Sequence, residues 1–125
     1  MTNAYWCLLA VILFPYFFVV AAKMGTPGFN NHAPRDTLEK AKGWARRCLW
    51  VEQNSYEILP AFAAAVIVAH TMGAEQDSID RLAYIFLASR IAYGACFVTD
   101  KATLRSLAWF AGMICVIGLF LLPQG

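Results

Sequence analysis

Four long apolar runs constrain the fold of this chain more than any other feature, and three of them contain no charged side chain. The runs comprise residues 2–22, 58–74, 82–99 and 106–125. Since a helix needs about 20 mostly apolar residues to cross a bilayer, each run approaches or exceeds the length of a spanning helix. With their polar end turns, the spans are expected at about 3–23, 44–73, 79–99 and 104–123. The sequence therefore predicts one domain over residues 1–125, an all-α integral membrane protein with a four-transmembrane-helix bundle.

Composition agrees with lipid as the main solvent. Hydrophobic residues make up 60% of the chain and charged residues only 14%, against about 45–50% and about 25% in ordinary soluble domains. Membrane lipid is therefore an expected partner. The net charge of +2 comes without a long lysine or arginine tract, so no nucleic-acid partner is predicted.

The first run is expected to remain as a span. A cleaved secretory signal would have basic residues before its apolar stretch, and the opening MTNAYWC has none. Lysine and arginine are concentrated in the first and third connections, whereas the second connection carries three acids and one arginine. By the positive-inside rule, both termini are predicted on the non-cytoplasmic side.

The cysteines and histidines give no sign of a metal site. The four cysteines are scattered without a C-x-x-C spacing, so we interpret them as small buried hydrophobes. Neither His32 nor His70 has a companion at ligand spacing. No metal is therefore predicted.

The second span is expected to begin well outside the bilayer. Asp36-Thr37-Leu38-Glu39 resembles a capping box, which predicts a helix from about Asp36. No residue before the apolar run is expected to stop it, so one helix continues through Gly43, and the length from Thr37 to Met72 is roughly 54 Å at about 1.5 Å per residue. Pro60 should kink this helix, because its ring removes a backbone hydrogen bond.

Polar residues form a stripe on the second span. Arg47, Asn54 and Glu57 share one face through their helical spacing, and Arg90 and Tyr93 repeat the pattern on the third span. An arginine facing lipid at the bilayer centre costs about 2.5–3.5 kcal/mol on insertion scales. Burial in protein is therefore expected, with Glu57 and Arg90 paired to each other or to a neighbouring subunit. A bundle this thin favours an oligomer that covers the stripes.

Three motifs carry a family resemblance. They are R-C-L-x-x-x-x-N-x-x-E-x-x-P at Arg47 to Pro60, R-x-x-Y at Arg90 to Tyr93, and L-R-S at Leu104 to Ser106. Together they resemble the MAPEG family, the membrane-associated proteins in eicosanoid and glutathione metabolism, over essentially the whole chain. The chain is most similar to the short bacterial members, and this implies the bacterial inner membrane as its location.

The resemblance implies a fold, a cosubstrate and a set of site residues. Members of the family are homotrimers of four-helix subunits that bind glutathione between subunits. The implied activity is that of a membrane-embedded glutathione-dependent transferase or peroxidase acting on lipophilic electrophiles. By resemblance, Arg105 stabilises the glutathione thiolate as the catalytic residue, and the ligand-binding positions are Arg47, Asn54, Glu57, Arg90 and Tyr93.

Each of these residues also has a purely structural interpretation. Arg47 could be an anchor at the membrane boundary, since long basic side chains reach from apolar surroundings to the interface. Asn54, Glu57 and Arg90 could form a polar clamp that fixes helix packing. Arg105 could simply begin the fourth span.

The alternative function is a non-catalytic protein of the same fold that binds a lipid or another hydrophobic ligand. Three substitutions motivate it: Trp50 and Gln53 stand where relatives often carry basic residues, and Phe97 where relatives carry tyrosine. A small four-span multidrug exporter would need an acidic residue in the first span, and residues 2–22 contain none.

Overall fold

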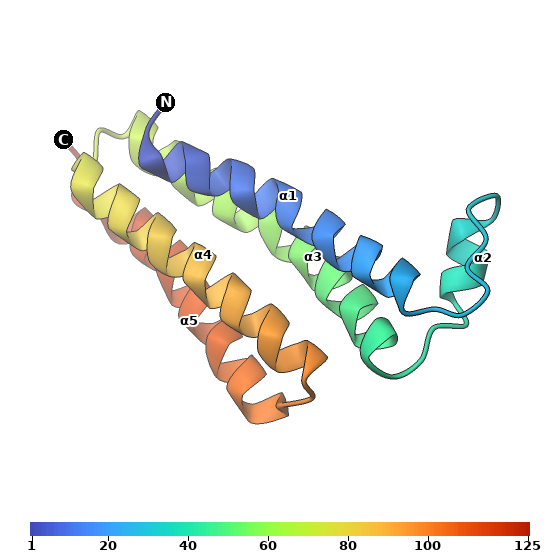
Figure 1. Cartoon of the computed structure of the whole chain (residues 1–125). Helices are drawn as coiled ribbons and strands as arrows, with labels where there is room; N and C mark the ends of the chain where they lie inside the picture. The colour runs from blue at the N-terminus through green and yellow to red at the C-terminus, as the bar shows by residue number, and fades with distance from the viewer.

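The computed structural model describes all 125 residues and is entirely helical, which confirms the all-α prediction. Five helices are present where four were predicted. They are α1 (Asn3–Met24), α2 (Pro34–Leu38), α3 (Gly43–Thr71), α4 (Gln76–Val98) and α5 (Ala102–Leu121). The four long helices form an elongated bundle and the short α2 stands off one end, here called the loop end (Figure 1). Both termini lie at the opposite, terminal end.

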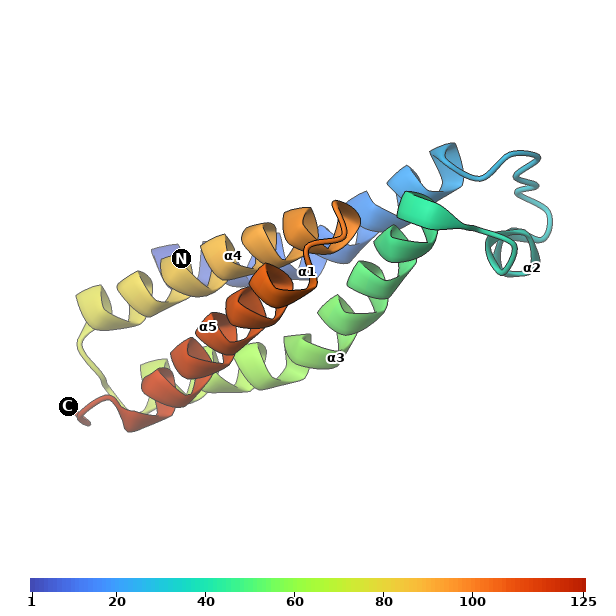
Figure 2. The same ribbon diagram turned by 90° about the horizontal axis from the view of Figure 1, so that it is seen from below.

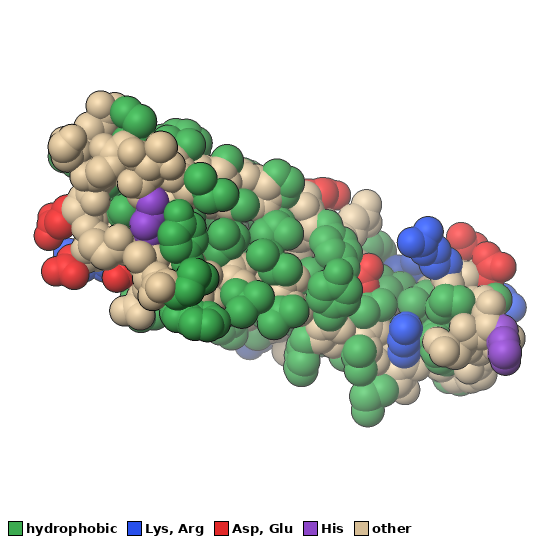
Figure 3. All heavy atoms as spheres, turned by 90° about the horizontal axis from the view of Figure 1, so that it is seen from above, with side chains coloured by type: hydrophobic (Ala, Val, Ile, Leu, Met, Phe, Trp, Pro, Cys, Tyr) green, Lys and Arg blue, Asp and Glu red, His purple; other side chains and the backbone are tan.

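Three of the long helices, α1, α4 and α5, are long and apolar enough to cross a membrane. The fourth, α3, is the longest, but its first half carries two arginines and two glutamates, which lower its mean hydropathy. Its second half, after Glu57, has no charged side chain. Figure 3 shows the resulting surface, in which apolar side chains cover the middle and charged groups gather at the two ends.

The bundle consists of two helix pairs. Helix α1 packs along α3 and α4 packs along α5, while contacts between α3 and α4 join the pairs. Figures 1 and 2 show α1 and α5 at opposite corners of this arrangement. The rings of Phe62 on α3 and Phe86 on α4, both fully buried, stack with centroids 3.9 Å apart. The core thus lies where the two pairs meet.

The predicted unbroken helix from Asp36 to Met72 is wrong. Helix α2 begins earlier, with Pro34 in its first turn, and ends at Leu38, and α3 begins at Gly43 with a positive φ of 60°. The guanidinium of Arg46 donates to the backbone carbonyls of Glu39 and Ala41. In a continuous helix these carbonyls would accept hydrogen bonds from backbone N–H groups. At the break, the Arg46 side chain donates the hydrogen bonds instead.

Pro60 lies inside α3 without ending it. Figure 2 shows the axis of α3 bending midway along its length, as expected where proline removes a backbone hydrogen bond.

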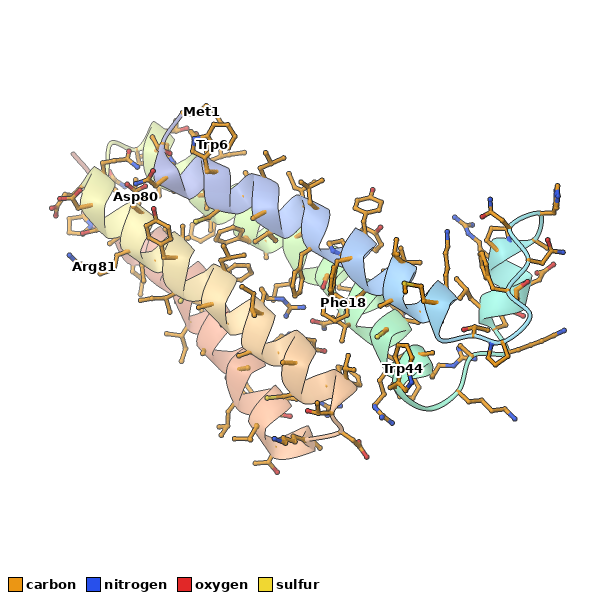
Figure 4. The ribbon with its side chains drawn as sticks, viewed as in Figure 1. Met1, Trp6, Phe18, Trp44, Asp80 and Arg81 are labelled. Carbon is orange, nitrogen blue, oxygen red and sulfur yellow. The ribbon has the colours of Figure 1, made fainter.

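The terminal end is held by polar contacts around the start of α1. Asp80 on α4 accepts a hydrogen bond of 2.9 Å from the backbone N–H of Ala4 and lies beside the first turn of α1 (Figure 4). The hydroxyl oxygen of Thr2 accepts from the N–H of Tyr5, whose ring stacks on His70 at 4.0 Å. The Asp80 carboxylate satisfies the otherwise unpaired N–H of Ala4 and complements the dipole of α1.

Candidate functional site

The centre of the candidate site is a buried arginine. Arg90 on α4 is 1% exposed and donates from Nη2 to Oδ1 of Asn54 at 2.9 Å and to Oγ of Ser55 at 3.3 Å, both on α3. The guanidinium carbon also lies 4.2 Å from the ring centroid of Tyr93, one turn further along α4. These contacts orient the side chain toward α3.

Two donor atoms of Arg90 have no partner. Its Nε and Nη1 are buried and make no hydrogen bond, and Glu57 is not among the groups that it contacts through a hydrogen bond. The predicted Glu57–Arg90 pair is therefore wrong within one chain, because Asn54, one turn earlier on α3, occupies that position. A buried guanidinium without a counter-ion is costly, so this site has an unmet capacity for an anion.

Aromatic rings connect Arg90 to the second arginine of the site. The ring of Tyr93 lies edge-on to that of Phe97, with centroids 5.6 Å apart. The guanidinium carbon of Arg105, at the start of α5, lies 4.6 Å from the centroid of Phe97. Each arginine thus rests on an aromatic face, a contact that favours a fixed orientation of the cation. Phe97 provides this support without offering a hydroxyl group.

Two small cavities flank this arrangement, and together they are called the polar cleft below. One, of about 250 Å³, lies along α4 and α5 and is lined by Tyr93, Phe97, Arg105, Ser106, Trp109 and Phe110. The other, of about 120 Å³, lies between α3 and α5 and is lined by Asn54, Glu57, Ile58, Ala61, Trp109 and Met113. The Trp109 side chain is half-buried and borders both cavities. Four of the six residues singled out in the sequence line these cavities, namely Asn54, Glu57, Tyr93 and Arg105. A fifth, Arg90, lines neither cavity but contacts Asn54 and Tyr93.

The sixth, Arg47, lies elsewhere. Its Nε donates to the backbone carbonyl of Val98 at 3.0 Å, and its side chain lines neither cavity of the polar cleft. The carbonyls in the last turn of a helix lack intrahelical partners, so Arg47 caps the end of α4. This contact joins α3 to α4 near the loop end.

The polar stripe on α3 is only partly covered by the chain itself. Asn54 is half-buried, whereas Glu57 and Trp50 are exposed. The fully buried face of α3 runs one position away, through Val51, Ser55 and Ile58. In the third span, by contrast, Arg90 and Tyr93 are buried. The expected burial of the α3 stripe is thus not met within one chain, and Glu57 remains open to whatever covers α3 and α5.

Ser55 and Trp109 are site residues that sequence reasoning missed. Ser55 follows Asn54 directly but sits off the polar stripe, so the three-and-four spacing did not select it. Trp109 lies one turn after Arg105, on the same face of α5. That spacing was visible in the sequence and could have identified it.

The groups around the polar cleft have complementary charges for a zwitterionic ligand. The two guanidinium groups of Arg90 and Arg105 favour carboxylates or another anion, and Glu57 favours an ammonium group. No group of three or more His, Cys, Asp or Glu side chains is positioned to hold a metal ion. A ligand with several charges near an apolar membrane region is the best match to this set.

Comparison with known proteins gives one clear result. The sequence model of the MAPEG family matches residues 3–124, which is nearly the whole chain. No curated protein matches the chain.

Proposed function

Because the chain belongs to the MAPEG family and holds three helices apolar enough to cross a bilayer, it is an integral membrane protein, and we propose that it is a glutathione-dependent transferase or peroxidase. Its substrates would be lipophilic electrophiles that reach the polar cleft from the membrane. The observation that best supports this proposal is the buried guanidinium of Arg90, whose Nε and Nη1 lack partners. This guanidinium contacts Asn54 and Tyr93, which line the cleft that contains Arg105 and Glu57.

The proposal includes α3 as a fourth span and a single domain over residues 1–125. Support comes from the uncharged second half of α3 and from its packing along α1. Orientation rests on the basic residues of the loop end, which would place that end in the cytoplasm and both termini outside. The resemblance to the short bacterial members would place the protein in the bacterial inner membrane.

A homotrimer is part of the same proposal. Glu57 is exposed on a helix that would lie partly in the membrane, and an uncovered carboxylate there is unfavourable. A neighbouring subunit on the α3 and α5 face would cover it and would close the polar cleft. The site would then be complete only between subunits.

Glutathione carries two carboxylates, one ammonium group and one thiol, and charged side chains in and beside the polar cleft could bind three of these four groups. Arg90 would bind a carboxylate through its free donors, and Glu57 would bind the ammonium group. Asn54 and Tyr93 would donate hydrogen bonds that orient the peptide. Arg47 would act indirectly, by holding the end of α4 through Val98.

Arg105 would act on the thiol. An unperturbed thiol has a pKa of about 8.5, so only a few per cent is ionised at neutral pH. A guanidinium nearby favours the thiolate, which is the nucleophile. In conjugation the thiol loses its proton, a sulfur–carbon bond forms, and the leaving group departs with its electron pair. In peroxide reduction two thiols are oxidised to a disulfide while the peroxide becomes an alcohol and water.

A second candidate function is a non-catalytic member of the fold that holds a lipid or another hydrophobic ligand in the cleft. The observation that favours it is the apolar character of Phe97, whose ring faces Arg105 where a hydroxyl group would help to bind a thiolate. Trp50 and Gln53, both exposed, add no positive charge to α3.

Conjugation of a chloronitrobenzene by the purified full-length protein tests the proposal. At millimolar glutathione, we expect activity above the uncatalysed rate, and a loss of about 10²-fold or more in Arg105→Ala, the scale seen when one stabilising group for a developing anion is removed. Arg81→Ala, at the terminal end, is the matched control and should retain full activity. Activity at the uncatalysed rate, or equal activity in Arg105→Ala and the unmodified protein, would count against the proposal.

A further inference from the structure

A second, larger cavity lies on the other side of the bundle, where α1 and α4 separate toward the loop end. It has a volume of about 390 Å³, and nearly all of its lining is apolar. Its walls come from Phe14 and Phe17 on α1, from Ile91 and Ala95 on α4, and at the loop end from Trp44. Trp44 lies between the two helix pairs at that end (Figure 4). This cavity is called the apolar groove below.

The apolar groove is separate from the polar cleft. The two share no lining residue, and the groove lies between α1 and α4 whereas the cleft lies along α5. Its floor is Gly94, where a Cβ atom would lie 2.6 Å from Cζ of Phe18. Glycine thus permits the phenylalanine rings of α1 to approach α4, so that the groove is bounded on the inside by packed side chains.

The dimensions of the groove match one leaflet of a bilayer. Its lining runs along α4 from Ile91 to Thr99, the residue that follows the helix, and eight steps of about 1.5 Å each give roughly 12 Å. Half of a hydrocarbon core of about 30 Å is roughly 15 Å. Phe17 and Ile91 on its rim are 69% and 55% exposed, so the groove opens toward the surroundings of the bundle. It would therefore be filled from the side by an acyl chain.

Basic residues surround the loop end of the groove. Lys42 lies two residues before Trp44, and Lys101 lies two residues after Thr99, and both are exposed. Lys23 follows the groove residue Ala21 by two positions, with its ammonium 5.3 Å from the ring centroid of Phe29. The one acidic residue in these short segments is Asp100. The charge at this end is therefore complementary to an anionic headgroup.

We propose that the apolar groove binds one acyl chain of an anionic phospholipid from the leaflet at the loop end, with its phosphate beside Lys42 and Lys101. This site is independent of glutathione chemistry. A lysine near an anionic lipid surface contributes about a fivefold preference, so two lysines should select strongly against a zwitterionic lipid. The positive charge at the mouth of the groove also argues against a second copy of the chain as the occupant, because the loop end of that copy would carry the same cations.

Lipid retention measured by native mass spectrometry tests the site. The full-length protein is purified in mild detergent and mixed with equal amounts of phosphatidylglycerol and phosphatidylcholine that carry identical acyl chains. We expect one retained phosphatidylglycerol per chain, favoured about fivefold or more. Ala95→Trp fills the exposed wall of the groove and should reduce retention about fivefold or more on the same scale. Ala92→Trp, on the exposed side of α4 outside the groove, should leave retention unchanged.

Charge variants test the headgroup contact separately. Lys42→Gln/Lys101→Gln should abolish the preference for phosphatidylglycerol, whereas Lys40→Gln/Arg81→Gln, with the same change in net charge, should preserve it. Equal retention of the two lipids by the unmodified protein would overturn the headgroup assignment. Equal retention by Ala95→Trp and the unmodified protein would overturn the site. A change of oligomeric state in Ala95→Trp, with no lipid retained by the unmodified protein, would also overturn it.

A measurement without a bulky substitution guards against misfolding. Phosphatidylglycerol with brominated acyl chains, added at one lipid per chain, should quench the fluorescence of Trp44. The quenched fraction should therefore decrease clearly in Trp44→Phe. Equal quenching in both proteins would place the lipid elsewhere and contradict the proposal.

Discussion

Arg90 on α4 donates a hydrogen bond of 2.9 Å to the side chain of Asn54 on α3, and this contact connects the two helix pairs of the bundle. Ser55 accepts a second bond from the same Nη2 atom. The arginine is nevertheless only half satisfied, because Nε and Nη1 have no partner. A residue that served only as a clamp would be expected to use all of its donors, so we propose that Arg90 has two roles, packing and anion binding.

Arg90→Met separates these two roles. Ser55 retains its 2.7 Å bond to the carbonyl of Val51, and Asn54 is only half-buried, so neither group loses all of its partners. Apolar replacement of a buried ionic group often changes stability little. We therefore expect the free energy of unfolding, measured by thermal unfolding in detergent, to change by less than about 1 kcal/mol. Glutathione binding should weaken roughly 10- to 150-fold, because a charged hydrogen bond contributes about 1.5–3 kcal/mol.

The opposite pattern would identify a clamp. If Arg90→Met lost more than about 3 kcal/mol of unfolding free energy, as when one member of a buried charge pair is removed, and still bound glutathione with unchanged affinity, the residue would be structural alone. Calorimetric titration with glutathione and thermal unfolding on the same preparations distinguish the two results.

Arg47→Gln should show the reverse of Arg90→Met. Its bond to the carbonyl of Val98 caps α4, and loss of such a cap costs about 0.5–2 kcal/mol. We therefore expect a lower thermal midpoint with a glutathione dissociation constant within about twofold of the unmodified value, since a twofold change corresponds to only about 0.4 kcal/mol. A tenfold weaker affinity at unchanged stability would show that Arg47 contacts the ligand directly.

Gly94→Ala should destabilise the bundle, because the added Cβ would lie 2.6 Å from the Phe18 ring. Overpacking of this kind costs about 1–3 kcal/mol. Gly118→Ala is the matched control, since there the nearest atom is a Leu82 methyl group at 3.4 Å. Alanine favours a helix by about 1 kcal/mol over glycine, so the control should be neutral or slightly stabilising. Equal effects at both positions in thermal unfolding would contradict this packing.

Asp80 should contribute to stability through the start of α1. Asp80→Ala leaves the N–H of Ala4 without its acceptor, which should cost about 1 kcal/mol. Asp80→Asn keeps an acceptor oxygen and loses only the charge, so about half of that effect or less is expected from the helix dipole. Thermal unfolding of the two variants measures both losses of stability. A larger loss in Asp80→Asn than in Asp80→Ala would contradict the prediction.

The helices themselves could be predicted from the sequence because apolar run length decides them in a membrane protein. The break between α2 and α3 could not, since it depends on Arg46 reaching back to the carbonyls of Glu39 and Ala41. Local capping rules describe side chains that bond to the backbone of their own helix end. They do not describe a side chain such as Arg46, which bonds to the backbone of an earlier segment. The glycine at position 43 was the one sign of a break in this part of the sequence, and in the structure Gly43 has a φ of 60°.

Within the site, residue types and faces were predictable and the pairing was not. Asn54 and Glu57 share one stripe, so either could have met Arg90. The rotation of α4 against α3 decides between them, and the stacked Phe62 and Phe86 rings are part of the core contact between these helices. Helical spacing on one helix carries no information about the rotation of its neighbour.

Ultraviolet absorbance of the glutathione thiolate, measured as glutathione is titrated into the full-length protein at neutral pH, tests the central claim most directly. Free glutathione contributes only a few per cent thiolate there, given a thiol pKa of about 8.5. The account predicts a saturable thiolate signal for the unmodified protein and its loss in Arg105→Ala, while Arg81→Ala behaves as the unmodified protein. Absence of a saturable signal at millimolar glutathione, or an undiminished signal in Arg105→Ala, would contradict it.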